Sequence, residues 1–113
     1  MSRRIFVLGL DGVDPDLLEK YLKAGMLPNF GKLINTGIYG RITSTLPTIT
    51  TVTWSSFITG KNPGKHGIYG FVNYRKGSHE LKVLNSHDRE TCGIWEMINS
   101  AGKSVGIFNL PSL

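Results

Sequence analysis

The sequence is poor in cysteine and has no long hydrophobic run. Cys92 is its only cysteine, so an intrachain disulfide is impossible, which fits a reducing compartment. The apolar residues 5–10 follow two arginines but stop at Asp11, and this run is too short for a secretory signal or a membrane span. We therefore expect a cytoplasmic protein without a membrane segment, in which Cys92 is a small buried hydrophobe on a helix.

Acidic residues are absent between Lys20 and His79, where eight lysines and arginines occur. We call residues 20–79 the acid-free window. Its positive charge favours anionic partners such as phosphate esters, nucleic acids or acidic surfaces. The basic residues are scattered, so a solvated basic face that is balanced by acids elsewhere also explains them. We expect no specific nucleic-acid site.

The order of apolar and capping patterns predicts an α/β fold in one domain, residues 1–113. Residues 4–10 form a continuous apolar run, which is typical of a strand buried in a mainly parallel sheet flanked by helices. Further strands are expected at 38–45 and 103–110, two short strands within 68–84, and helices at 14–25, 28–37, 51–59 and 89–102. The last strand would have no helix to cover it. This favours either self-association through the uncovered sheet or an N-terminal fragment of a longer chain.

Asp11 is the first candidate site residue, because it comes directly after the predicted first strand. In open α/β sheets, ligands gather at the carboxyl ends of the parallel strands. A carboxylate in that position suits a divalent cation such as zinc, manganese or magnesium. The Asp-Gly pair at residues 11 and 12 is also a common turn signal, and this alternative remains open.

Hydroxyl side chains are concentrated between Thr43 and Thr59, where ten of seventeen residues are serine or threonine. A helix that begins near Thr51 would present unpaired backbone N–H groups and its positive dipole end near Thr50, which suits a phosphate. Thr50 is therefore either the N-cap of that helix or a hydroxyl placed to attack phosphorus.

Two other patterns carry less information. The glycine-rich segment 60–67 has the wrong spacing for a phosphate-binding P-loop, and a histidine stands where the P-loop has serine or threonine. The spacings between His66, His79 and His87 match no local metal motif, so we interpret these histidines as structural or surface residues.

Residues 4 to about 71 resemble the start of the type I phosphodiesterase and nucleotide pyrophosphatase family, within the alkaline phosphatase superfamily. The resemblance extends more weakly to residues 95–111. Its motif positions are Asp11, Pro47, Thr48, Thr50, Thr59, Gly60, Pro63, His66 and Gly67. It implies an alkaline-phosphatase-like fold in which Thr50 is the catalytic nucleophile and Asp11 and Thr50 bind the same metal. His66 belongs to the family's loop signature but not to its metal ligands.

The resemblance also implies a mechanism with two divalent metal ions, zinc or manganese, acting on a phosphate-ester or nucleotide substrate. Family members are several times longer than this chain, and their other metal ligands lie beyond the matching region. We therefore expect the N-terminal part of a metal-dependent phosphodiesterase or nucleotide pyrophosphatase that is inactive alone. The alternative is a non-catalytic α/β domain that binds an anion or a partner protein.

Overall fold

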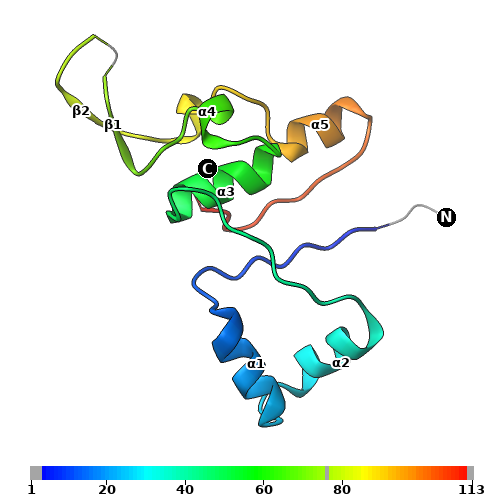
Figure 1. Ribbon diagram of the computed structural model, residues 1–113. Helices are drawn as coiled ribbons and strands as arrows, with labels where there is room; N and C mark the ends of the chain where they lie inside the picture. Colours follow the sequence, from blue (N-terminus) through cyan, green and yellow to red (C-terminus); the bar gives the residue numbers. More distant parts are fainter. Residues whose placement is uncertain (1–3, 76, 112–113) are drawn as a thin grey trace. The chain divides into compact units, whose positions relative to one another are not determined.

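The computed structural model describes residues 4–75 and 77–111. The chain divides into two units, Met1–Ile42 and Thr43–Leu113, and each is described by itself. Figure 1 labels the helices and strands along the chain. Among the described residues, no helix has the length and apolar character that a membrane crossing requires.

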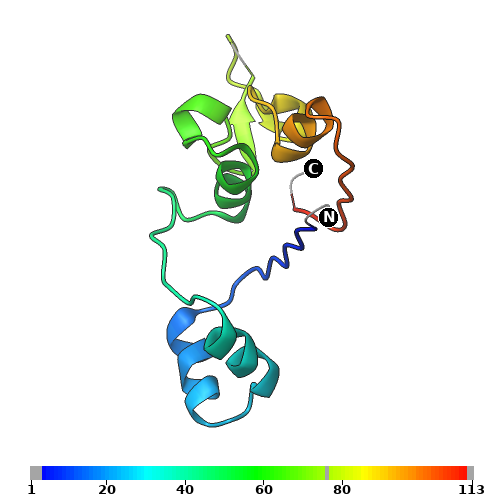
Figure 2. The ribbon, with the colours of Figure 1, turned by 90° about the vertical axis from the view of Figure 1, so that its right-hand side faces the viewer.

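The first unit contains two helices that contact each other, α1 (Pro15–Lys23) and α2 (Pro28–Thr36), drawn in blue and cyan in Figure 2. Asp14 caps α1, because its side chain accepts a hydrogen bond from the Leu17 backbone N–H at 2.9 Å. Pro15 fills the first helical position, where its missing N–H costs no hydrogen bond. Helix α2 begins at Pro28, as predicted, and α1 begins one residue after the predicted start at residue 14.

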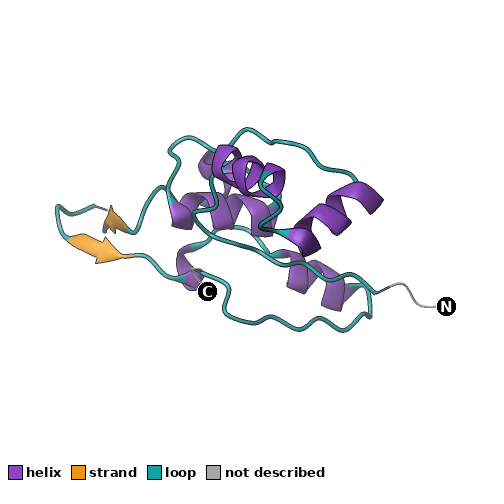
Figure 3. Cartoon of the chain, turned by 90° about the horizontal axis from the view of Figure 1, so that it is seen from below, coloured by secondary structure: helices purple, strands orange, loops and turns teal. Residues whose placement is uncertain are grey.

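The predicted strand at residues 4–10 is wrong for the described structure. These residues form no sheet ladder and are drawn as a loop in Figure 3. Ile5 and Phe6 are 89% and 88% exposed. An apolar run becomes a buried strand only when neighbouring strands pair with its N–H and C=O groups, and no described residue does so here.

The predicted strands at 38–45 and 103–110 are also loops, so the described residues contain no parallel sheet. The strands that do form are β1 (Val72–Tyr74) and β2 (Leu81–Val83), an antiparallel pair in which Val72 lies opposite Val83 and Tyr74 opposite Leu81. This hairpin confirms the two short strands expected within 68–84. The described chain is therefore a mixed helix and strand structure with a two-stranded antiparallel sheet.

The core of the second unit lies around α3 (Thr50–Thr59) and the short α4 (Pro63–His66), which contact each other. Val52, Ile58 and Ile68 supply its buried apolar side chains. Gly60 ends α3 in the left-handed conformation, with φ of 63°, as expected for a glycine that stops a helix.

The chain continues through η1 (Ser86–Asp88) to α5 (Ile94–Ser100). The helix expected at 89–102 is thus shorter, because Gly93 is its N-cap and residues 89–92 form a loop. A side chain at Gly93 would come within 2.9 Å of Ile58 Cγ2, so a glycine is needed where α5 approaches α3. The interpretation of Cys92 as a buried helical residue is wrong, since Cys92 lies in this loop and is exposed.

Candidate functional site

Thr50 is the first residue of α3. The N-cap is Ile49, with φ of −115° and ψ of 139°, and no side-chain capping bond is found among the described residues. The interpretation of Thr50 as the N-cap is therefore wrong. The first hydrogen bond of the helix runs from the Thr53 N–H to the Ile49 carbonyl at 2.9 Å. The N–H groups of residues 50–52 therefore have no acceptor within the helix. These groups and the helix dipole make the start of α3 suitable for an anion.

Four of the nine other hydroxyl side chains between Thr43 and Thr59 take part in hydrogen bonds among the described residues. Thr59 Oγ1 donates to the Ser55 carbonyl at 2.7 Å, which is a bond within α3. Thr45 Oγ1 and Thr53 Oγ1 are 3.1 Å apart and hydrogen-bonded. These hydroxyls therefore form local bonds within α3 and between α3 and the residues before it.

His66 is a buried structural residue, with no exposed surface. Its Nδ1 accepts from the Ile68 N–H at 3.1 Å. Nδ1 therefore carries no proton, and Nε2 donates to Ser56 Oγ at 2.9 Å. Burial lowers the pKa of His66, and the positive charge of Arg89 lowers it further. The neutral imidazole thus joins α4 to α3, which agrees with the structural interpretation of His66.

Arg89 is a buried cation that the sequence analysis did not single out. Its side chain is 7% exposed, and its Nε donates to the Thr91 carbonyl at 3.0 Å. The guanidinium carbon lies 5.1 Å from the centre of the Trp95 ring, and Nη2 is 3.8 Å from Glu96 Oε1. No sequence pattern marked this arginine, whose partners Thr91, Trp95 and Glu96 lie in the loop before α5 and in α5 itself.

Thr51 and Arg89 line a small cavity of about 10 Å³, together with Ser55, Asn85 and Ser86. Thr51 is 7% exposed, and its Oγ1 has no hydrogen-bond partner among the described residues. A cavity of this size holds about one water molecule. It can satisfy the Thr51 hydroxyl with a water, but it is too small for a phosphate ester.

Asp11 lies in a turn with Gly12, whose φ is 70°, and its side chain is exposed. This geometry agrees with the turn interpretation and leaves the carboxylate accessible. Asp11 belongs to the first unit and Thr50 to the second.

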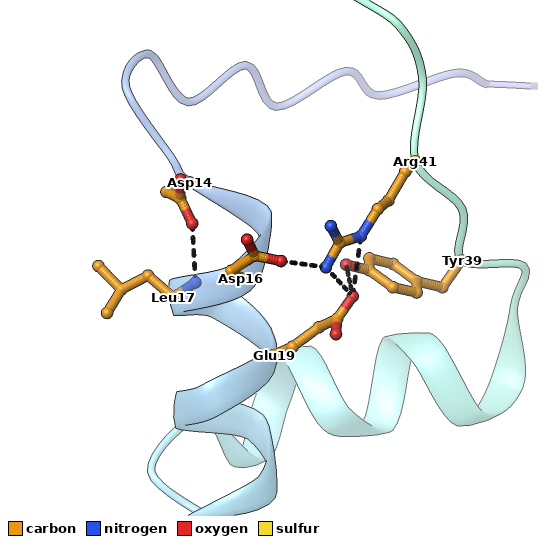
Figure 4. A network of polar contacts seen from close by, with 6 residues as sticks. All are labelled: Asp14, Asp16, Leu17, Glu19, Tyr39 and Arg41. Atoms are coloured by element: carbon orange, nitrogen blue, oxygen red, sulfur yellow. Dashed lines mark hydrogen bonds and ion pairs between the residues drawn. The ribbon is translucent and has the colours of Figure 1, made fainter.

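Four charged and aromatic side chains form a network in the first unit, shown in Figure 4. Arg41 Nη2 lies 2.6 Å from Asp16 Oδ1 and 2.7 Å from Glu19 Oε1. Arg41 Nε and Tyr39 Oη also donate to Glu19 Oε1, at 3.1 and 3.3 Å. The hydrogen bond from Arg41 lowers the pKa of Glu19, and the two carboxylates raise the pKa of Arg41. Arg41, from the acid-free window, is thus balanced by acids just outside it.

A metal site is not formed by the residues that the structure describes. Within residues 4–75 and 77–111, no group of three or more histidine, cysteine, aspartate or glutamate side chains could hold a metal ion. Asp11 and Thr50 offer one carboxylate and one hydroxyl, and a closed site takes about four ligands. The described donor set does not by itself fit the metal centre that the sequence resemblance implies.

Comparisons with known proteins returned one informative match. The profile of the family described as type I phosphodiesterase / nucleotide pyrophosphatase matches residues 5–112. Searches of curated proteins and of solved structures gave no match.

Proposed function

Because the chain belongs to the type I phosphodiesterase / nucleotide pyrophosphatase family, we propose that it carries the threonine nucleophile of a hydrolase that cleaves phosphodiester or pyrophosphate bonds. The family match covers nearly the whole chain, including the hydroxyl-rich segment before and within α3. Phosphate esters and nucleotides are the substrate class that this family implies.

The position of Thr50 at the start of α3 is the observation that carries the proposal. The residue before it supplies no side-chain cap among the described residues, so the helix N-terminus is available for an anion. Thr50 is a half-buried residue of the first helical turn, so its hydroxyl is close in sequence to these N–H groups. A phosphoryl group bound there would lie close to a nucleophile that is already ordered by the helix.

In the proposed reaction, Thr50 attacks phosphorus and the start of α3 binds the phosphoryl oxygens. The Thr50 oxygen forms a bond to phosphorus, the bond from phosphorus to the leaving oxygen breaks, and the hydroxyl proton passes to solvent. The backbone N–H groups at the start of α3 stabilise the negative charge on the non-bridging phosphoryl oxygens. Water then cleaves the phosphothreonine ester and regenerates the hydroxyl.

Metal dependence is a separate part of the proposal. We propose Asp11 and Thr50 as ligands of a divalent cation, zinc or manganese, as the family resemblance implies. Zinc titration by calorimetry tests this assignment, with Asp11→Asn as the variant and Asp14→Asn, three residues away in the helix cap, as the matched control. Binding that is unchanged in Asp11→Asn would remove Asp11 from the metal site.

Trapping the covalent intermediate tests the nucleophile directly. Bis(4-nitrophenyl) phosphate with zinc or manganese should release at most about one equivalent of nitrophenolate and leave a 4-nitrophenylphosphoryl group on Thr50, located by peptide mass spectrometry. Thr50→Ala should give neither product, and Thr43→Ala should behave as wild type. An adduct on another residue, or none in wild type, contradicts the proposal. Sustained hydrolysis that disappears in Thr50→Ala would support the nucleophile and overturn the expectation that this chain is inactive alone.

A non-catalytic anion-binding or partner-binding domain is the second candidate. The absence of a three-residue metal group among the described residues favours it. Binding of inorganic phosphate that survives Asp11→Ala and does not respond to divalent metal would select this alternative. Self-association remains a prediction that sedimentation velocity can check.

A further inference from the structure

Thr45 contacts both the segment before α3 and the helix itself. Its hydroxyl donates to the Pro47 carbonyl at 3.3 Å and shares a hydrogen bond with Thr53 Oγ1 at 3.1 Å. Thr45 and Thr53 are both partly buried, and all three residues belong to the second unit. A side chain five residues before Thr50 is therefore bonded to the first turns of its helix.

The direction of these bonds follows from the number of protons. A threonine hydroxyl has one proton and two acceptor lone pairs. Since Thr45 donates to the Pro47 carbonyl, the shared bond is donated by Thr53 and accepted by Thr45. The Pro47 carbonyl also accepts the Ile49 N–H at 3.0 Å. Thr53 thus donates to Thr45, and Thr45 donates to the Pro47 carbonyl. The same carbonyl accepts the N–H of Ile49, the N-cap residue, and we call these three hydrogen bonds the chain of bonds.

Thr50 and Thr53 are three residues apart on α3, so they lie on the same face of the helix. The chain of bonds ties the residues before Thr50 to that face and fixes the backbone at Ile49, where the chain enters the helix. We propose that Thr45 is a positioning residue for Thr50, acting through Thr53 and the Pro47 carbonyl. This inference rests on the proposed function of Thr50.

The same bonds limit how a phosphoryl group is held. The Thr53 proton is directed to Thr45, so Thr53 does not donate to a phosphoryl oxygen while this chain of bonds is intact. The backbone N–H groups at the start of α3 then provide the donors, and Thr45 keeps them ordered.

Isosteric substitution of Thr45 tests the inference, because valine keeps the side-chain shape and removes the hydroxyl. Four proteins are compared: wild type, Thr45→Val, Thr45→Ser, which keeps the hydroxyl, and Thr43→Val, the same change at an exposed position. The first measurement is hydrogen exchange of the Ile49 amide by NMR, without ligand. We expect exchange about tenfold faster in Thr45→Val, since loss of one neutral hydrogen bond is worth about a factor of ten, and wild-type exchange in the other two variants.

The second measurement is the rate at which bis(4-nitrophenyl) phosphate with zinc modifies Thr50. Thr45→Val should lower the rate at saturating ester about tenfold, with the half-saturating concentration unchanged, and Thr45→Ser should restore it. Thr53→Val should show the same loss. The double variant should be no slower than the slower single variant, because both substitutions break one chain of bonds.

The exchange and reaction-rate measurements together decide whether Thr45 positions Thr50. Unchanged exchange at Ile49 in Thr45→Val overturns it, whether or not Thr50 reacts. Faster exchange with an unchanged reaction rate also overturns it, since Thr45 would then order the loop without affecting Thr50. Absence of any Thr50 adduct in wild type contradicts the proposed function, and with it the positioning role, even where the exchange data show that Thr45 holds the loop.

Discussion

The backbone N–H of Ile68 donates to Nδ1 of His66 at 3.1 Å, and this bond fixes the protonation state of the imidazole. The bond requires a neutral ring whose proton lies on Nε2, where Ser56 accepts it. A second proton would occupy the lone pair that holds the Ile68 N–H. The hydrogen bond from the Ile68 N–H is therefore present only while His66 is neutral.

The second unit should lose stability as the pH falls. The pKa of His66 is lowered from its ordinary value of 6.5, so below that pH the unfolded chain binds a proton that the folded chain excludes. The stabilisation is complete above about pH 6.5 and decreases as the pH falls through the lowered pKa. Urea midpoints followed by tryptophan fluorescence report this unit, because Trp54 and Trp95 both lie in it.

The control for this prediction is His87→Gln, which removes an exposed histidine of the same unit. It should keep the difference in midpoint between pH 7.5 and pH 5.5, whereas His66→Gln should reduce that difference. Equal pH dependence in wild type and His66→Gln would show that other groups cause the effect.

Thr50→Ala should leave the stability of the second unit almost unchanged. The structure places the N-cap at Ile49, so the substitution removes no capping bond and should change the free energy of unfolding by less than about 0.5 kcal/mol. Asp14→Ala, which removes the true cap of α1, should cost about 1 kcal/mol of helix stability, measured by circular dichroism. A loss near 1 kcal/mol in Thr50→Ala would restore the capping interpretation.

Arg41→Met should release residues 37–42 from α1. Arg41 joins this segment to Asp16 and Glu19, and methionine keeps the aliphatic stem without the charge. Chymotrypsin should therefore cleave after Tyr39 faster in Arg41→Met than in wild type, and Lys32→Met should show the wild-type rate. Because the pKa of Glu19 is lowered, the stabilisation is present above its ordinary value of 4.5 and is lost as the pH falls through the lowered value. Equal cleavage of Arg41→Met and wild type would contradict a holding role for this network.

Cys92 should react in the folded protein. The thiol is exposed in the loop before α5, so a disulfide reagent such as dithionitrobenzoate should modify one equivalent at a rate close to that in urea. Cys92→Ser provides the blank. Modification that begins only on unfolding would support the original prediction of a buried cysteine.

Several helix boundaries could be predicted from the sequence because their signals are local. Asp14, Pro15, Pro28 and Gly60 act within one helical turn, and the structure places them at helix ends. Strands depend on partners that are distant in sequence. Residues 4–10 have the composition of a buried strand, yet no described segment pairs with them, and composition alone could not indicate this.

In the candidate site, too, features with a local sequence signal could be predicted and features that depend on packing could not. The helix start near Thr50 could be predicted from the hydroxyl-rich segment 43–59, whose residues are close together in sequence. The burial of Arg89 and the bond from Thr53 to Thr45 depend on side-chain positions in the folded chain, so no spacing rule identified them. Cys92 was predicted to be helical because the expected helix, 89–102, began four residues before Gly93. In the structure Gly93 is the N-cap of α5, so Cys92 precedes the helix.

The arginines of the acid-free window bear on how an anion would be attracted. Arg41 pairs with Asp16 and Glu19, and Arg75 lies 3.5 Å from Glu80, so both guanidinium groups already face carboxylates. The other basic residues of the window are lysines, whose compact charge lacks the planar fork that matches phosphate geometry. Lysines steer a phosphate ester over long range, in a manner that added salt weakens, and they do not distinguish a monoester from a diester. Discrimination between esters would then depend on the directional N–H groups at the start of α3.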